Sequence, residues 1–238
     1  MRRERRRLIV RLAAALAAAP LARSRAAEVA ASDARLDTAT TEYGGSRCYV
    51  ARPRSGAVRL PTVIVLHDER GLGARMEDMA RRAALAGFAA IAPELSSARG
   101  DEPIGNLVAL TDQVAARPES GKLGCLGFSS GGTLALELAA RRETIVAAVA
   151  FYAALPAVLE VPRIKARVLL HLAENDPEIN TRVPAYEAAL NAAGVQNAIH
   201  VYPGTDHDFH DDSVARHHAE AAALAWSRTV AFLKDALP

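Results

Sequence analysis

Short apolar runs alternate along the chain with longer segments in which apolar residues recur every three or four positions. The run "PTVIVLH" has no polar alternation, which is typical of a strand that is covered on both faces in a parallel sheet. The other short runs also predict strands, and the longer periodic segments predict amphipathic helices. The predicted strands cover residues 40–52, 60–67, 88–93, 123–128, 146–152, 168–172 and 198–202, and the predicted helices cover 76–86, 104–117, 130–142, 183–193 and 213–236.

The order of these elements indicates the fold class. Strands and helices alternate from residue 60 to the end of the chain, which predicts an α/β protein with a mostly parallel central sheet and helices on both faces. Neither a repeat nor a linker divides the sequence after residue 27. We therefore predict a single domain over residues 28–238, which is long enough to bury a sizeable core.

Residues 1–27 have a different character. Arginines come first, followed by a mostly apolar run at 8–22 and by small residues at 24–27, a pattern that is typical of an export signal. The stretch "RRRLI" also resembles a twin-arginine signal. We expect export to the periplasm or the medium if this signal is functional, and a cytoplasmic protein otherwise. Arg11 interrupts the apolar run, which is too short for a stable membrane anchor.

The charge of the chain is concentrated in that first segment. Residues 1–27 have an excess of seven positive charges and the whole chain carries +2, so residues 28–238 are net negative by five. A nucleic-acid-binding domain needs a basic face, and we expect no nucleic-acid partner for this one.

The most informative motif is "GFSSGG" at residues 127–132, a G-x-S-x-G pattern between a predicted strand and a predicted helix. Its glycines allow a sharp turn that presents the Ser129 hydroxyl. The N-terminus of the next helix directs unpaired N–H groups to the same place. We predict that Ser129 is a nucleophile and that Ser130 contributes its backbone N–H to an oxyanion site. A purely structural turn is the alternative.

A serine nucleophile needs a base, and the base needs an orienting acid. Polar residues follow two later strands, at the carboxyl ends where open α/β sheets place their sites. Asp176 follows "RVLLHLA" and His207 follows "AIHVY" and a Pro-Gly turn. The order Ser129, Asp176, His207 is the order of α/β-hydrolase triads. Glu174 is a rival to Asp176 as the acid.

The sequence resembles the dienelactone hydrolase family from residue 43 to the C-terminus. The resemblance is carried by the segments "VIVLHDERGLGARMEDMARRAALAGFAAIAPEL", "GKLGCLGFSSGGTLA", "AAVAFYA", "VLLHLAENDPEINTRVPAYEAALNAAGV" and "HVYPGTDHDFHDD". It implies an α/β-hydrolase fold and hydrolysis of a lactone or small ester without metal or cofactor. It also implies Ser129 as nucleophile, Asp176 as orienting acid and His207 as base.

Three departures from the family pattern concern the site. Founding members have cysteine where this chain has Ser129, and a serine depends more on its base. The family often has a glutamate three residues before the glycine of the first site loop. Here that position is Asp68, which we expect either to act in the site or to pair with Arg70. By position, the backbone N–H of Glu69 is a second oxyanion donor.

The third departure is the short segment at residues 93–122, which has room for one helix and little else. In the family this region shapes the substrate pocket and can offer an arginine to a carboxylate. Arg99 is the candidate here, and a solvated surface arginine is the alternative.

Two other kinds of protein remain open at this point. The cluster "TDHDFHDD" contains His207 and His210 and could serve a metal-dependent hydrolase, although it lacks an H-E-x-x-H spacing. A relative that keeps the fold but only binds ligands is the second alternative. We predict a carboxylic ester hydrolase without cofactor or metal, acting on a small-molecule ester or lactone, and we expect a monomer.

Overall fold

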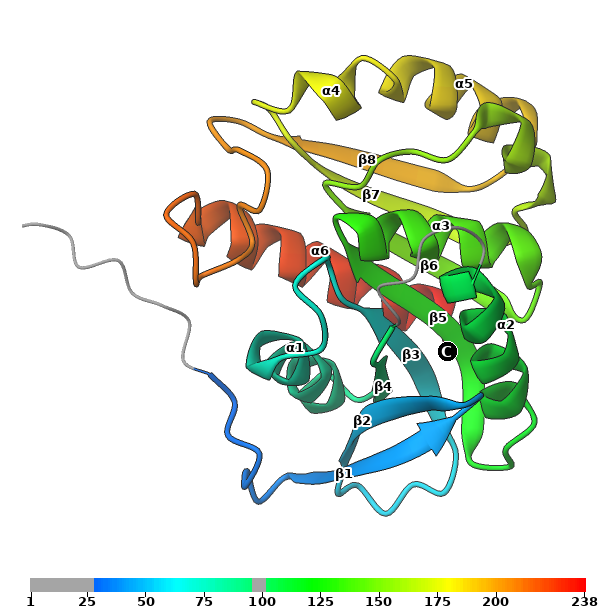
Figure 1. Cartoon of the computed structure of the whole chain (residues 1–238), viewed down its shortest axis with the longest axis vertical. Helices are drawn as coiled ribbons and strands as arrows, with labels where there is room; N and C mark the ends of the chain where they lie inside the picture. Colours follow the sequence, from blue (N-terminus) through cyan, green and yellow to red (C-terminus); the bar gives the residue numbers. More distant parts are fainter. Residues whose placement is uncertain (1–27, 96–101) are drawn as a thin grey trace, which may run out of the picture.

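The computed structural model describes residues 28–95 and 102–238, so the predicted export signal and Arg99 lie outside the described residues. Strands and helices alternate as the sequence predicts (Figure 1). The elements are β1 (Leu36–Tyr43), β2 (Ser46–Pro53), β3 (Leu60–Leu66), α1 (Ala74–Leu85), β4 (Ala89–Pro93), α2 (Glu102–Ala115), β5 (Ser120–Phe128), α3 (Ser130–Arg141), β6 (Ile145–Phe151), the 3-10 helix η1 (Val158–Arg163), β7 (Arg167–Ala173), α4 (Pro177–Asn180), α5 (Val183–Ala192), β8 (Asn197–Tyr202) and α6 (Ala219–Ala236).

In this part of the chain, eight strands form one sheet in the order β1-β2-β4-β3-β5-β6-β7-β8. β2 pairs with β1 and with β4 in antiparallel fashion, and every neighbouring pair from β4 to β8 is parallel. In Figure 1 the sheet runs from β1 and β2 at the bottom to β8 near the top. The predicted mostly parallel sheet is therefore confirmed.

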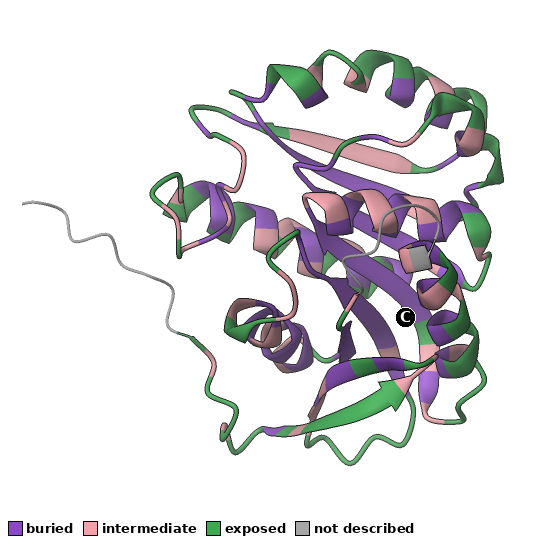
Figure 2. Ribbon diagram, viewed as in Figure 1, coloured by how far each residue is buried: buried purple, intermediate pink, exposed green. Residues whose placement is uncertain are grey.

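The central strands are apolar because helices cover both faces of the sheet. On β3, Val63 and Val65 pack into one core with residues of α1 and α6, while Ile64 and Leu66 pack into a second core with α2 and α3. Figure 2 shows the result, with buried central strands and a largely exposed β1 at the edge. Burial on both faces explains why "PTVIVLH" shows no polar alternation.

Two predicted elements are wrong in their bounds. Residues 40–52 form two strands, because Gly44 and Gly45 make a tight turn with φ values of 58° and 78°. Such left-handed values favour glycine and suit a two-residue hairpin. The last helix begins at Ala219 and not at residue 213, since the His218 side chain caps it by accepting from the Ala221 N–H. The first difference adds one antiparallel strand to the predicted sheet.

The junction between β5 and α3 is packed through backbone atoms. A Cβ atom on Gly127 would lie 2.0 Å from the carbonyl oxygen of Gly131, and one on Gly131 would lie 2.4 Å from the carbonyl oxygen of His67. These distances are shorter than any non-bonded carbon–oxygen contact, so only glycine fits at either position. The glycines of the motif therefore allow β5, α3 and the end of β3 to approach each other closely.

A glycine substitution tests this close approach. We expect Gly131→Ala to lower the free energy of unfolding by about 1–3 kcal/mol or more, because the new methyl group overpacks the junction. Gly105→Ala in α2 is the matched control, since its Cβ would meet nothing within 4 Å and alanine favours a helix by about 1 kcal/mol. Urea unfolding measures both. Equal midpoints for Gly131→Ala and the native protein would contradict the steric account.

Candidate active site

Ser129 occupies the sharp turn between β5 and α3. Its backbone has φ 50° and ψ −119°, a conformation that a residue with a side chain adopts only when its surroundings impose it. Its N–H donates to the carbonyl oxygen of Phe151 at 3.0 Å, and its own carbonyl oxygen accepts from the Gly132 N–H at 2.9 Å. These bonds hold the turn on both sides of the serine.

His207 links Ser129 to Asp176. Its Nδ1 lies 2.7 Å from Asp176 Oδ2, and its Nε2 lies 3.1 Å from Ser129 Oγ. Because the carboxylate can only accept, Nδ1 carries the proton and Nε2 is free to accept from the Ser129 hydroxyl. The three residues that the sequence separates by many positions therefore form one continuous hydrogen-bonded chain.

The loops after β7 and β8 fix this geometry by bonding to each other. The Asn175 N–H donates to the Thr205 carbonyl oxygen at 2.9 Å, and the Asn175 side chain donates to Asp206 at 3.0 Å. Glu174, the rival acid, accepts from the Gly204 N–H at 2.8 Å and so anchors the turn before His207. The geometry therefore separates the two acids, with Asp176 at the histidine and Glu174 at the loop backbone.

The loop after β3 brings a further carboxylate to the serine. Glu69 Oε1 lies 3.3 Å from Ser129 Oγ, so the hydroxyl has two acceptors within reach. The neighbouring His67 fixes the start of this loop, since its Nδ1 donates to the Asp68 carbonyl oxygen and its Nε2 accepts from the Leu95 N–H. The sequence predicts a role for the Glu69 backbone N–H, and the structure adds a contact between the Glu69 side chain and Ser129.

These residues surround a cavity of about 410 Å³. Ser129, His207, Asp176 and Glu69 line it. Its apolar walls are completed by side chains from α2, α3, α4 and the segment after β6, namely Pro103, Leu134, Ala154 and Ile179. A small molecule in this space would contact the Ser129 hydroxyl directly.

Comparison with known proteins identifies the family. The family model of the dienelactone hydrolase family matches residues 46–103 and 95–237. A candidate carboxymethylenebutenolidase of Yersinia pestis is 32% identical over 213 residues, which cover 76% of this chain and 80% of the relative. The chain belongs to the dienelactone hydrolase family.

Two further relatives support this membership. A candidate 2-oxo-3-(5-oxofuran-2-ylidene)propanoate lactonase of a Bradyrhizobium species is 30% identical over 225 residues, covering 80% of this chain and 90% of the relative. The crystal structure of a candidate dienelactone hydrolase from Klebsiella pneumoniae is 29% identical, with a TM-score of 0.76 over 84% of this chain and 98% of that one. This dienelactone hydrolase family member is thus a carboxylic ester hydrolase with the α/β-hydrolase fold.

In this member of the dienelactone hydrolase family, Asp68 pairs with one arginine of its own loop and with one arginine of α1. Its buried carboxylate contacts Arg70, and Arg75 Nη1 lies 3.2 Å from it. Of the two expectations for Asp68, the structure therefore favours the pair with Arg70 and does not bring its side chain to Ser129. Glu69, one residue later, is the carboxylate that contacts Ser129.

The two arginines join the loop after β3 to the loop that carries His207. Arg70 Nη1 lies 2.6 Å from Asp211 Oδ2, and Arg75 Nε lies 3.3 Å from Asp211 Oδ1. Burial alone would raise the pKa of Asp68 and of Asp211, but hydrogen bonds and the guanidinium charges outweigh burial. The pKa of each carboxyl therefore lies below its ordinary value, and both aspartates are ionised in the folded protein at neutral pH.

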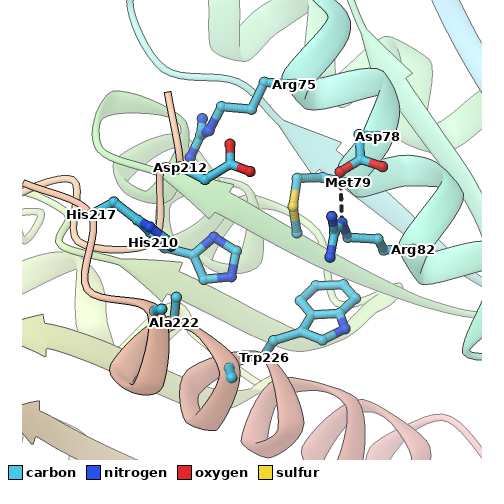
Figure 3. A pocket seen from close by; sticks show the side chains of 11 residues that line it. Arg75, Asp78, Met79, Arg82, His210, Asp212, His217, Ala222 and Trp226 are labelled. Atoms are coloured by element: carbon cyan, nitrogen blue, oxygen red, sulfur yellow. Dashed lines mark hydrogen bonds and ion pairs between the residues drawn. The ribbon is translucent and has the colours of Figure 1, made fainter. Parts of the chain in front are cut away.

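Arg75 contacts two aromatic residues next to the candidate active site. Its Nη2 lies 3.3 Å from the Tyr152 hydroxyl, and its guanidinium carbon lies 4.9 Å from the centre of the Phe128 ring. On its other side, Arg75 lines a second cavity of about 340 Å³ between α1 and α6, together with Arg82, His210 and Trp226 (Figure 3). Nothing in the strand-end pattern indicates Arg75, because it lies on α1.

The Tyr152 ring packs against the ring of His207. It is fully buried with φ 37°, and its ring centre lies 4.9 Å from that of His207. Burial raises the pKa of its hydroxyl well above the ordinary value, so Tyr152 is neutral and packs as an aromatic wall. Its place directly after the apolar run "AAVAF" indicates a residue that packs at the edge of the pocket, and the contact with His207 agrees with this.

The histidine-rich segment does not form a metal-ligand cluster. Within residues 28–95 and 102–238, no group of three or more histidine, cysteine or carboxylate side chains is placed to hold a metal ion. His210 turns away from His207 and packs against the Phe128 and Phe151 rings. Burial lowers its pKa to about 3, so it is neutral at physiological pH.

Over the same described ranges, no helix is long and apolar enough to cross a membrane.

The pH dependence of the free energy of unfolding tests whether the ion pairs of Asp68 and Asp211 with Arg70 and Arg75 stabilise the protein. A carboxyl whose pKa is depressed by folding stabilises the protein above its ordinary pKa of about 3.9 and loses this contribution as the pH falls through the folded value. We expect the free energy of unfolding to fall between about pH 5 and pH 2, and to fall less steeply in Asp211→Asn. Urea unfolding at a series of pH values measures this.

The matched control is Asp37→Asn, which removes an exposed ion pair with Arg54 at 2.6 Å. We expect its stability at neutral pH to change by no more than about 1 kcal/mol. The role assigned to the buried cluster fails if native protein and Asp211→Asn lose stability equally on acidification.

Proposed function

We propose that this protein hydrolyses a small ester or lactone through an acyl-enzyme formed on Ser129. The observation that carries the proposal is the hydrogen-bonded chain from Ser129 Oγ to His207 Nε2 at 3.1 Å and from His207 Nδ1 to Asp176 Oδ2 at 2.7 Å. Membership of a family of carboxylic ester hydrolases supports the same reaction class.

In the first half-reaction, Ser129 Oγ attacks the carbonyl carbon while its proton passes to His207 Nε2. Asp176 holds the imidazole in the tautomer that accepts this proton and stabilises the imidazolium that results. The alcohol oxygen leaves with the proton that His207 gives back. The serine is then acylated and the histidine is again neutral.

The developing oxyanion is stabilised by two backbone N–H groups. Ser130 is the first residue of α3, so its N–H has no carbonyl partner within the helix and points out of its N-terminus. The Glu69 N–H is the second donor by its place in the loop after β3. Preorganised donors of this kind supply a large share of catalysis in acyl transfer.

In the second half-reaction, His207 takes a proton from water, and the resulting hydroxide attacks the acyl carbon. The same two N–H groups stabilise the second oxyanion. Collapse of this intermediate releases the acid, and the proton returns from His207 to Ser129. The scheme balances without a metal or a cofactor.

The names of the relatives suggest a range of substrates. They include carboxymethylenebutenolidases and a lactonase, so lactones and small esters are the compounds to test. A binding protein without turnover is the competing function. The close fit of Ser129, His207 and Asp176 supports catalysis, because ligand binding alone would not require this order of donors and acceptors.

Removal of the nucleophile or the base tests the scheme. We expect Ser129→Ala and His207→Ala each to lower kcat for phenyl acetate by about a millionfold, with correct folding confirmed by circular dichroism. Ser227→Ala on the exposed face of α6 is the matched control and should keep full turnover. Unchanged turnover in Ser129→Ala would exclude the acyl-enzyme. Failure of the native protein to turn over any ester or lactone would favour the binding protein.

The two candidate acids give a second test. We expect Asp176→Asn to lower kcat by about ten-thousandfold, because the histidine loses the partner that fixes its tautomer. Glu174→Gln removes a carboxylate that lies close to Asp176 in the sequence, accepts from the Gly204 N–H and does not contact His207. The kcat of this variant should therefore stay within about tenfold of the native value. The opposite ranking would show that Glu174 is the orienting acid.

A further inference from the structure

Asp208, the residue after His207, has a left-handed backbone conformation with φ 67°. Residues with a side chain seldom adopt such values, although aspartate and asparagine tolerate them better than most. The Asp208 carbonyl oxygen accepts from the Asp211 N–H at 2.8 Å, and the Phe209 N–H donates to the Asp206 carbonyl oxygen at 3.1 Å. These two turns hold the left-handed conformation and fix the direction in which the Asp208 side chain leaves the backbone.

The Asp208 carboxylate lies beside the histidine nitrogen that faces Ser129. Its Oδ1 is 4.0 Å from His207 Nε2, and the same Nε2 is 3.1 Å from Ser129 Oγ. The first distance is too long for a hydrogen bond but short enough for attraction between opposite charges. Since only 13% of the Asp208 side chain is exposed, solvent screens this attraction incompletely. Asp208 therefore acts on His207 by charge whenever Nε2 holds a proton.

Two arginines oppose the negative charge of Asp208. Arg216 Nη2 lies 3.1 Å from Asp208 Oδ2, and Arg70 Nη2 lies 3.7 Å from Asp208 Oδ1. The Arg216 side chain is 54% exposed, so it can be replaced without opening a space in the core. The field of Asp208 at His207 is thus reduced by a surface arginine that an experiment can remove.

Other charged or titratable groups face His207 or Asp208. They come from the loop after β3, the end of β6 and the segment at α4, and are Glu69, Arg70, Tyr152, Asp176 and Glu178. Asp176 bonds to Nδ1 of the histidine, whereas Asp208 lies 4.0 Å from Nε2. A comparison of variants that differ at one charge leaves all the other groups in place, so it isolates the contribution of that one charge.

We propose that Asp208 is a positioning residue that acts through His207: its carboxylate stabilises the imidazolium formed during acyl transfer, and Arg216 weakens this effect. This proposal rests on the proposed function, in which His207 takes the Ser129 proton. When Ser129 Oγ bonds to the carbonyl carbon, its proton passes to Nε2, and positive charge forms 4.0 Å from Asp208 Oδ1. The proton then passes to the leaving alcohol oxygen, so Asp208 remains ionised throughout.

The pH dependence of kcat/KM for phenyl acetate tests the proposal, because protonation of His207 in the free enzyme stops its action as a base. Asp208→Asn removes the charge and keeps a side chain of the same shape that tolerates the left-handed backbone. We expect the acid-side pH of half-maximal kcat/KM to fall by about 0.5–1 unit. The maximal kcat/KM should fall by about two- to threefold, since a less basic histidine takes the serine proton less readily.

Arg216→Gln should have the opposite effect. Without this arginine the charge of Asp208 is less compensated, so the same pH of half-maximal kcat/KM should rise by about 0.3 unit. In the Asp208→Asn background the rise should be smaller, because the carboxylate through which Arg216 acts is missing. Glu187→Gln, which removes an exposed acid on α5 outside the cavity lining, is the matched control and should leave this pH within about 0.1 unit of the native value.

Asp208→Gly is the second variant, since glycine adopts a φ of 67° freely and lacks the carboxylate. It should move the pH of half-maximal kcat/KM in the same direction as Asp208→Asn, and it replaces that variant if Asp208→Asn does not fold. A merely structural role would lower kcat/KM at every pH without moving this value, and that result, or a move to higher pH, overturns the role of Asp208. A Ser129→Ala protein that still hydrolyses phenyl acetate overturns the proposed function instead.

Discussion

The geometry of this site depends on the close backbone contact between β5, α3 and the end of β3. Gly127 and Gly131 leave no room for a side chain, and the turn between them forces Ser129 into a backbone conformation with φ 50°. The same contact brings the loop after β3 next to the serine, which places Glu69 Oε1 3.3 Å from Ser129 Oγ. Ser129, the N-terminus of α3 and the loop after β3 are thus positioned by one steric constraint.

A second set of interactions positions the partners of the serine. The loops after β7 and β8 bond to each other through Asn175 and Glu174. The loop with His207 is also held by the pairing of the buried Asp211 with Arg70 and Arg75. Since charges paired in a buried site are costly to separate, this arrangement keeps the histidine close to both Ser129 and Asp176.

The sequence predicted the parts of the site that follow apolar strands, because a parallel sheet collects its strand ends at one edge. Ser129, Asp176 and His207 were found in this way. The hairpin at Gly44-Gly45 was missed because two strands separated by a turn of only two residues read as one run. The role of Arg75 on α1 could not be predicted, and neither could the finding that Glu69 and not Asp68 contacts Ser129. Both depend on side-chain directions that only tertiary packing determines.

The central claim is that Ser129 becomes acylated during turnover. Its most direct test is rapid quenching of the enzyme with an activated aryl acetate, followed by intact-protein mass spectrometry and peptide mapping. The account predicts a transient mass increase of one acetyl group per chain, located on the peptide that contains Ser129 and prolonged in a variant impaired in deacylation. Steady turnover with no acetylated enzyme at any quench time, or an acetyl group stable on another residue, would contradict it.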